Sequence, residues 1–292
     1  IRDVERSRGL GDVYKRQGDD SVLVIDAQAT PNLARLVIQK VRSVTDKPIS
    51  HLVLSHYHAV RVLGAAEYKA SNIIMSSKAR SMVIERGQED WDSEFDRFPR
   101  LFKGHEEIQG LTWPTTTFDK KMSLFLGKRR VDLYFLGRAH TAGDIVVHVP
   151  DSNTLFTGDI VEYKSACYCG DAHLQDWPQT LEKIAKFQAV SLVPGRGDAL
   201  TDPRQIDDAI ELTEDFVTST FKSVSKIAHA GGDLKEAMSS CRDECDKKFS
   251  DYAIYEHCLP FNVSRAFDEA KGIDNPRIWT AERDKEMWNL LQ

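Results

Sequence analysis

The sequence predicts an α/β fold followed by a helical C-terminal extension. Three observations carry this prediction. Short β-branched runs alternate with amphipathic helical stretches up to about residue 200, and from Pro203 onward apolar residues recur at helical spacing with few strand candidates. The chain of 292 residues, of which 41% are apolar, is also long enough to bury a large core. We therefore expect a main domain over residues 18–200 and a helical extension over residues 201–292.

The first elements are predicted to be a strand, a helix and a second strand. Residues 21–26 form a short β-branched run that ends in an acid. Thr30 is placed to cap a helix with Pro31 in its first turn, where the missing N–H of proline costs nothing. Pro48 ends this segment, and residues 51–55 form an apolar strand that leads straight into a histidine-bearing loop.

Strands and helices continue to alternate through the rest of the main domain. Gly231-Gly232, Pro260 and Gly272 are expected to separate the helices of the extension. Further strands are predicted at residues 72–75, 122–126, 131–135, 145–149, 154–157 and 191–193, and a helix at residues 178–186.

Composition excludes several classes of partner and location. The net charge of −6 gives no general attraction to nucleic acid or to anionic membranes, and no apolar run approaches the ~20 residues that span a bilayer. Five cysteines, an odd number in a long chain, favour a reducing compartment, so a cytoplasmic location is expected. Residues 1–17 lack an initiating Met and apolar periodicity, so we interpret them as a non-native leader.

Candidate metal ligands follow several of the predicted strands. His56 and His58 lie two residues apart just beyond residues 51–55, where an extended backbone points both imidazoles the same way, toward one ion. His140 stands in Gly-Arg-Ala-His-Thr-Ala-Gly, and Asp159 ends Leu-Phe-Thr-Gly-Asp, each just after a strand. The side chains that carry chemistry are therefore predicted at strand ends.

Together these segments resemble the metallo-β-lactamase superfamily, which carries His-x-His-x-Asp-His, Gly-x-x-His-Thr-x-Gly, Phe-x-Gly-Asp and a late Pro-Gly-His in that order. The resemblance covers about residues 18–198. It implies an αββα sandwich, two mixed β-sheets packed face to face with helices on both outer faces, here with a C-terminal helical appendage. It also implies that His56, His58 and His140 form the first metal site, and that Asp159 matches the acid that bridges two metals in many members.

The chain departs from this family pattern at the second metal site. Val60 and Arg61 stand where the family has Asp and His, and Arg196 stands where it has the late His. A guanidinium has no lone pair for a metal, so the second ion is expected to be absent or weakly bound. Arg61 and Arg196 are candidate catalytic residues that orient an anionic substrate group beside Asp159. The alternative is an ion pair with Asp159 that locks the pocket.

One transition-metal ion is expected, with zinc as the first expectation and iron as the alternative. Three imidazoles with an open position are typical of catalytic zinc, whereas imidazoles with a carboxylate also suit non-haem iron. The leading function is a single-metal hydrolase acting on a small ester, thioester or lactone-like anionic substrate. The acid missing at Val60 usually orients the attacking water in the family, and Asp159 is the nearest replacement for it.

Two other functions remain open on the sequence. The persulfide dioxygenases of the same superfamily hold one iron at positions matching His56, His140 and Asp159, and bound iron with oxygen consumption would indicate that chemistry. The loss of second-site ligands also fits a non-catalytic binding protein, which predicts no stoichiometric metal. Hydrolysis of β-lactams is not expected, because the superfamily is much broader than its name.

A few residues outside these motifs are also assigned. The segment around Asp171 is expected to border the pocket, and His173 is the best candidate among the remaining histidines. His257 and Cys258 are expected to belong to the helical extension alone, with folding back over the pocket as the alternative. The aromatic-rich residues 91–102 fit either a lid-like helix or ordinary packing.

Overall fold

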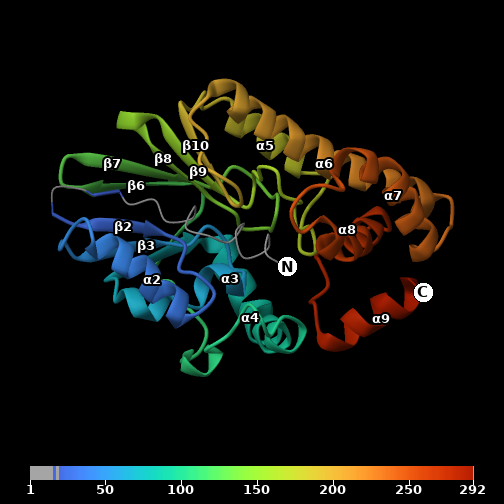
Figure 1. Cartoon of the computed structure of the whole chain (residues 1–292), viewed down its shortest axis with the longest axis horizontal. Coiled ribbons are helices and arrows are strands. Elements are labelled where there is room, and N and C mark those ends of the chain that lie inside the picture. The colour runs from blue at the N-terminus through green and yellow to red at the C-terminus, as the bar shows by residue number, and fades with distance from the viewer. Residues whose placement is uncertain (1–15, 18–19, 292) are drawn as a thin grey trace.

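Two five-stranded β-sheets pack face to face in the computed structural model, and helices cover both outer faces (Figure 1). The structure describes residues 16–17 and 20–291. The strand order is β1-β2-β3-β4-β5 in the first sheet and β10-β9-β8-β7-β6 in the second. This four-layer arrangement is the αββα sandwich that the sequence predicts.

The first sheet is mostly parallel. Strands β2 to β5 pair in parallel, and β1 pairs with β2 in the antiparallel direction. Residues 1–15 of the expected leader lie outside the described residues, whereas its last two residues form β1. The strands are β1 (Arg16–Gln17), β2 (Val22–Ile25), β3 (Ile49–Val53), β4 (Asn72–Ser76) and β5 (Thr116–Phe118).

The second sheet is mostly antiparallel. Strands β6 to β9 form a meander, and β10 joins β9 in parallel after a helical crossover. The strands are β6 (Lys121–Leu126), β7 (Arg129–Tyr134), β8 (Val146–Val149), β9 (Thr154–Gly158) and β10 (Ser191–Pro194).

Residues that alternate along a strand fill two different apolar layers. Leu23 and Ile25 of β2 belong to the core between the two sheets, together with Val147 of β8. Val22 and Val24, their neighbours on β2, instead pack in the layer that includes the α2 residues. Because successive strand side chains point to opposite faces, one continuous apolar run in the sequence supplies both layers.

Helices α2 to α4 lie beside the first sheet, whereas α5 and α6 cover the second sheet and α7 and α8 continue beyond it (Figure 1). Among the described residues, no helix combines the length and the apolar character needed to cross a bilayer. The helices are α2 (Pro31–Arg42), α3 (Ala59–Val62), α4 (Ser77–Arg97), α5 (Trp177–Ala185), α6 (Pro203–His229), α7 (Leu234–Phe249), α8 (Tyr255–Ala270) and α9 (Ala281–Leu291), with short 3-10 turns at Ala65–Tyr68, His105–Glu107 and Pro150–Ser152.

One expected helix boundary is wrong. Pro260 does not separate two helices but lies inside α8. A proline inside a helix removes one backbone hydrogen bond and costs roughly 3 kcal/mol. The apolar burial of Leu259, Val263 and Ala266 on the same helix, each 0% exposed, offsets this cost.

Candidate metal centre

The candidate ligands and Arg196 follow four strands and meet at one edge of the sandwich, where Arg61 joins them from α3. His56 and His58 follow β3, His140 follows β7, Asp159 follows β9 and Arg196 follows β10. All three histidines are buried, and their candidate ligand nitrogens lie within 4.8 Å of one another. The fold thus brings together a group of imidazoles that could hold a metal ion.

His56 is held from behind through Ser55. The Ser55 hydroxyl donates to the Asp26 carboxylate at 3.0 Å, so it must accept from Nδ1–H of His56, which lies 2.9 Å away. Nε2 of His56 then carries a lone pair. This nitrogen is buried and has no hydrogen-bond partner among the described residues. A buried acceptor without a partner is costly, and a metal ion is one partner that suits it.

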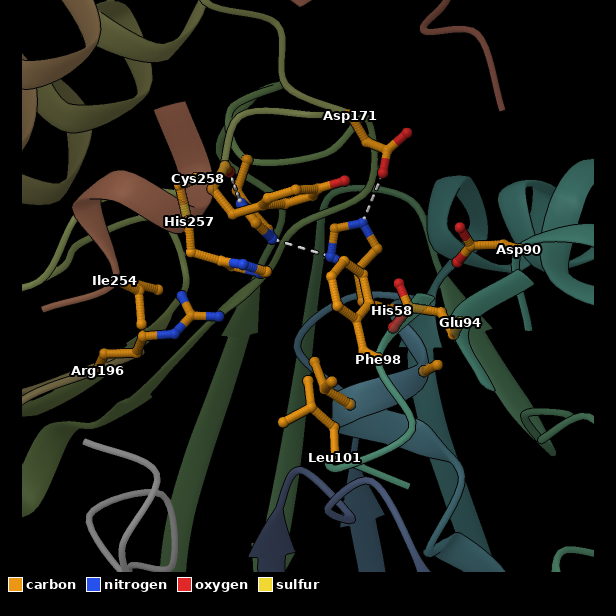
Figure 2. Close-up of a pocket in the computed structure, with 14 residues that line it drawn as sticks. His58, Asp90, Glu94, Phe98, Leu101, Asp171, Arg196, Ile254, His257 and Cys258 are labelled. Carbon is orange, nitrogen blue, oxygen red and sulfur yellow. Dashed lines mark hydrogen bonds and ion pairs between the residues drawn. The ribbon is translucent and has the colours of Figure 1, made fainter. Parts of the chain in front are cut away.

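His140 and His58 face each other at 3.0 Å between Nε2 and Nδ1. The Tyr168 carbonyl accepts from Nδ1–H of His140 at 2.8 Å, so Nε2 of His140 carries a lone pair. The Asp171 carboxylate accepts from Nε2–H of His58 at 3.0 Å (Figure 2). Nδ1, the other ring nitrogen of His58, therefore faces the lone pair on Nε2 of His140. A metal ion between the two rings would be a suitable partner for both nitrogens.

Burial favours the neutral form of His56 and of His140. It lowers the pKa of His140 to about 3 and the pKa of His56 well below its ordinary value. Metal ligation needs neutral imidazoles, and an outer partner on each ring is the usual way to fix the ligating nitrogen. The donor set of this chain therefore fits a transition-metal ion.

Asp159 is held by two guanidinium groups. Arg61 donates to Oδ1 of Asp159 and, at 2.8 Å, to the Gly195 carbonyl. Nη1 of Arg196 lies 3.3 Å from Oδ2 of Asp159 and also donates to the Glu162 carboxylate. Burial opposes ionisation of Asp159, but the charges of Arg61 and Arg196 outweigh it and hold the pKa of this carboxyl well below its ordinary value.

Oδ2 of Asp159 faces the histidines. It lies 3.6 Å from Nε2 of His140 and 4.0 Å from Nε2 of His56. Ligand atoms bound at about 2.0–2.1 Å around a tetrahedral ion are roughly 3.3 Å apart, so these separations are close to those of a shared coordination sphere. Asp159 is thus placed to join the three imidazoles.

The two arginines occupy different positions relative to the cavity beside the histidines. Arg196 lines this cavity, whereas Arg61 is not among its lining residues and is 5% exposed. Val60, which stands in place of an expected acid, also lines the cavity. Arg61 is therefore placed as a buried partner of Asp159, and Arg196 as the cation that reaches the cavity.

The cavity encloses about 70 Å³ and is walled by segments from both parts of the chain. Because one water needs roughly 10–15 Å³, the cavity has room for a group of several atoms. Helix α8 contributes His257 and Cys258, so the extension folds back over the pocket, the alternative reading of these residues (Figure 2). The complete lining is His58, Ala59, Val60, Asp90, Glu94, Phe98, Leu101, His140, Tyr168, Asp171, Arg196, Ile254, His257 and Cys258.

Sequence reasoning missed the contribution of α4. Asp90 and Glu94 line the cavity from this helix, and Phe98 and Leu101 follow just after it. The aromatic-rich residues 91–102 do contribute to the wall. Their spacing of four residues places both acids on one helix face, but it does not show that this face meets a cavity.

His173 does not line the cavity. Its Nδ1 lies 3.8 Å from an Asp274 carboxylate oxygen, and neither ring nitrogen has a hydrogen-bond partner among the described residues. Asp171, by contrast, takes part in the centre through its hydrogen bond to His58. The expectation that the Asp171 segment borders the pocket is confirmed.

Helix α8 also holds the loop that carries the outer partners of the histidines. The side chain of Asn262 accepts from the Cys169 amide at 2.7 Å and donates to the Cys167 carbonyl at 2.8 Å. These two contacts flank Tyr168, whose carbonyl accepts from His140. Helix α8 therefore supports the centre as well as lining the cavity.

Comparison with known proteins identifies a family. Residues 9–196 match the family model of the metallo-beta-lactamase superfamily. The chain is 33% identical over 123 residues to a metallo-beta-lactamase type 2 of Bacteroides fragilis, covering 40% of the chain and 47% of that relative. It is 31% identical over 104 residues to the type 2 enzyme of Elizabethkingia meningoseptica, covering 34% and 42%. The chain thus spans less than half the length of each of these two relatives.

Solved structures share the fold at low sequence identity. A metallo-beta-lactamase from Pontibacter korlensis matches 70% of the chain and 85% of its own with a TM-score of 0.55 and 19% identity. The DIM-1 metallo-beta-lactamase matches 70% of the chain and 83% of its own with a TM-score of 0.54 and 15% identity. At these identities the likeness concerns the fold alone.

Proposed function

The chain belongs to the metallo-β-lactamase superfamily, and on that premise we propose that it is a hydrolase that uses one transition-metal ion, with zinc as the expected metal. His56, His58 and His140 hold the ion, and Asp159 joins them. The substrate is a small ester, thioester or lactone-like molecule that carries an anionic group.

The observation that carries this proposal is the orientation of the three imidazoles. In His56 and His140, the outer ring nitrogen has a partner that fixes a proton there, so the inner nitrogen presents a lone pair. In His58 the outer nitrogen is paired with Asp171. A group of histidines that served only to pack the core would have no need for this common orientation.

When bound, a metal ion with an open coordination position acts as a Lewis acid, which polarises a carbonyl and makes water a stronger acid. Asp159 remains ionised at this site because its pKa is held well below the ordinary value. It therefore serves as a ligand and charge partner and not as a proton acceptor. Arg196 lines the cavity and offers a cation to the anionic substrate group.

The arginines also support a single ion. Arg61 occupies the space beside Oδ1 of Asp159 with a group that cannot ligate a metal. Arg196 places a second positive charge next to Oδ2. Two fixed cations therefore balance the Asp159 carboxylate where other family members bind a second metal.

Elemental analysis of the purified protein tests the proposal, with wild type beside His140→Ala. We expect close to one equivalent of zinc in the wild type and loss of this metal in the variant, accompanied by loss of activity in a screen of small esters and thioesters. His105→Ala is a matched control, because His105 lies in a 3-10 turn outside the cavity lining. Its metal content and activity should equal those of the wild type.

The other outcomes would point elsewhere. One equivalent of iron, with oxygen consumed in the presence of a persulfide, would favour the dioxygenase reading of His56, His140 and Asp159. No metal in either protein would contradict the proposal and favour a binding protein without catalysis.

A further inference from the structure

Two carboxylates form one wall of the cavity. Asp90 and Glu94 are four residues apart on α4, so their side chains lie on the same helix face. Figure 2 shows both carboxylates pointing from α4 toward His58. Like charges at this spacing destabilise a helix, and burial raises the cost. Ionisation of both carboxyl groups therefore lowers the stability of the fold unless a positive charge lies close to them.

In the described part of the chain, Asp90 has no cation within ion-pair distance, although Arg97 and His58 act on it electrostatically from farther away. Glu94 has Arg97 at 3.8 Å, and Asp171 has His58 and, at 3.5 Å, Arg86. The Asp90 side chain is 6% exposed, lines the cavity, and makes no hydrogen bond or ion pair with any residue in the described part of the chain. Burial, with Glu94 and Asp171 adding to it, raises the pKa of Asp90 to about 8, and the charges of His58 and Arg97 oppose this rise only in part.

The opposite side of the cavity carries a cation, Arg196, which is also paired with Asp159 and Glu162. Arg196 lies on the far side of His58 from Asp90 and Glu94 in Figure 2. Phe98 and Leu101 supply apolar surface to the same cavity. A ligand that suits all of these walls has a positive group and a negative group separated by a short apolar segment.

We propose that the substrate is zwitterionic, with a cationic nitrogen that binds Asp90 and Glu94 of α4 and an anionic group on the Arg196 side. This inference rests on the proposed hydrolase function and adds the second charge of the substrate. Asp90 accepts hydrogen bonds from the ammonium, which neutralises the wall of α4. The labile ester, thioester or lactone carbonyl lies between the two charges, beside the histidines.

Calorimetric binding to the protein as purified tests this inference without relying on turnover. The probes are ε-aminohexanoate, hexanoate and hexylamine, which differ only in which charged end is present. We expect ε-aminohexanoate to bind about ten- to a hundredfold more tightly than either single-ended probe, because each hydrogen bond to a charged group contributes substantially. Equal affinities, or no binding of the zwitterion, would overturn the inference.

Two isosteric variants locate the effect. Asp90→Asn and Glu94→Gln should each reduce the preference for ε-aminohexanoate over hexanoate and leave hexanoate binding unchanged. Asp96→Asn and Glu89→Gln are matched controls, since both residues are exposed positions of α4 outside the cavity lining. A preference that survives in Asp90→Asn and Glu94→Gln would show that the amine binds elsewhere.

Metal analysis of the same variants separates this inference from the proposed function. Metal content should be equal in wild type, Asp90→Asn and Glu94→Gln. Loss of metal in Asp90→Asn would overturn the inference, because the α4 acids would then bind an inorganic cation. If the protein bound metal and hydrolysed its substrate but showed no preference for the amine, the inference alone would be contradicted. If the protein bound the amine but contained no metal, the proposed function alone would be contradicted.

Discussion

Arg61 is the residue that keeps the Asp159 carboxylate ionised in a buried position. It donates to Oδ1 of Asp159, and its side chain is 6% exposed. Arg61→Met would leave Asp159 with Arg196 as its remaining cation close by. Removal of one partner from a buried ion pair typically costs 3–5 kcal/mol, so we expect a loss of about that size in the free energy of unfolding.

Urea denaturation of Arg61→Met measures this loss. Arg80→Met is the control, because Arg80 is exposed on α4 and its replacement should change stability by less than ~0.5 kcal/mol. Equal midpoints for Arg61→Met and wild type would mean that the Arg61–Asp159 pair contributes little.

Asp144 makes stability depend on pH. Burial raises the pKa of Asp144 to about 8, although the Thr141 amide and hydroxyl, at 2.6 and 2.9 Å, favour the ionised form. The folded protein therefore binds a proton between pH ~4 and ~8 that the unfolded chain releases. Stability attributable to Asp144 should fall as the pH rises through this window, by up to about 1.4 kcal/mol per pH unit.

The test is chemical denaturation of wild type and Asp144→Asn at a series of pH values after chelation of metals. The free energy of unfolding of the variant should fall less than that of the wild type as the pH rises from ~4 to ~8. Asp151→Asn, at an exposed position, should keep the wild-type profile. Parallel profiles for wild type and Asp144→Asn would rule out Asp144 as the source.

At the scale of residues, local sequence identified the candidate ligands, whereas their hydrogen-bond partners could not be predicted. His56, His58, His140 and Asp159 each follow a strand, so local sequence shows them. Asp171 lies 113 positions from His58, and nothing in a single sequence reveals that pairing. The acids of α4 were missed for a similar reason, because charged residues on a helix usually face solvent and only the tertiary structure turns these toward a cavity.

At the scale of elements, α8 connects the extension to the metal centre. Asn262 is 0% exposed and satisfies two backbone groups on either side of Tyr168. Asn262→Ala would leave both groups without their partner and release the carbonyl that orients His140. We expect metal affinity to fall roughly tenfold, with a stability loss of about 2–3 kcal/mol.

Competition with a chromophoric chelator measures the metal affinity of Asn262→Ala. Asn32→Ala, at an exposed position of α2, should bind metal like the wild type. If Asn262→Ala lost stability but kept full metal affinity, the contact between α8 and the loop would matter for packing alone.

The sequence predicted strands more reliably than the helical segments that close the site. The predicted strand at residues 154–157 appears as β9 (Thr154–Gly158), because a β-branched run between turn residues has few alternatives. The 21-residue helix α4 was largely missed, since its apolar residues do not form a clean stripe. In α8, the local signal of Pro260 was overridden by burial of its neighbours.

At the scale of the whole molecule, both sheets and the helical extension contribute to one site. The candidate ligands and Arg196 follow strands β3, β7, β9 and β10, Arg61 lies on α3, and α8 lines the same cavity. The sandwich could be predicted because the order of the motifs indicates the family. The position of the extension could not, since helical periodicity shows which face is apolar but not which partner it meets.

Because the candidate metal ligands follow strands of both sheets, metal binding should stabilise the sandwich as a unit. A ligand that binds only the folded state adds about 2.7 kcal/mol at a free concentration a hundred times its Kd. For a chain of 292 residues this corresponds to a rise in Tm of about 5 °C. Thermal unfolding after chelation and dialysis should therefore begin at lower temperature, and added zinc should restore it. His140→Ala should show neither effect, whereas a zinc-dependent shift of equal size in His140→Ala would place the stabilising ion at another site.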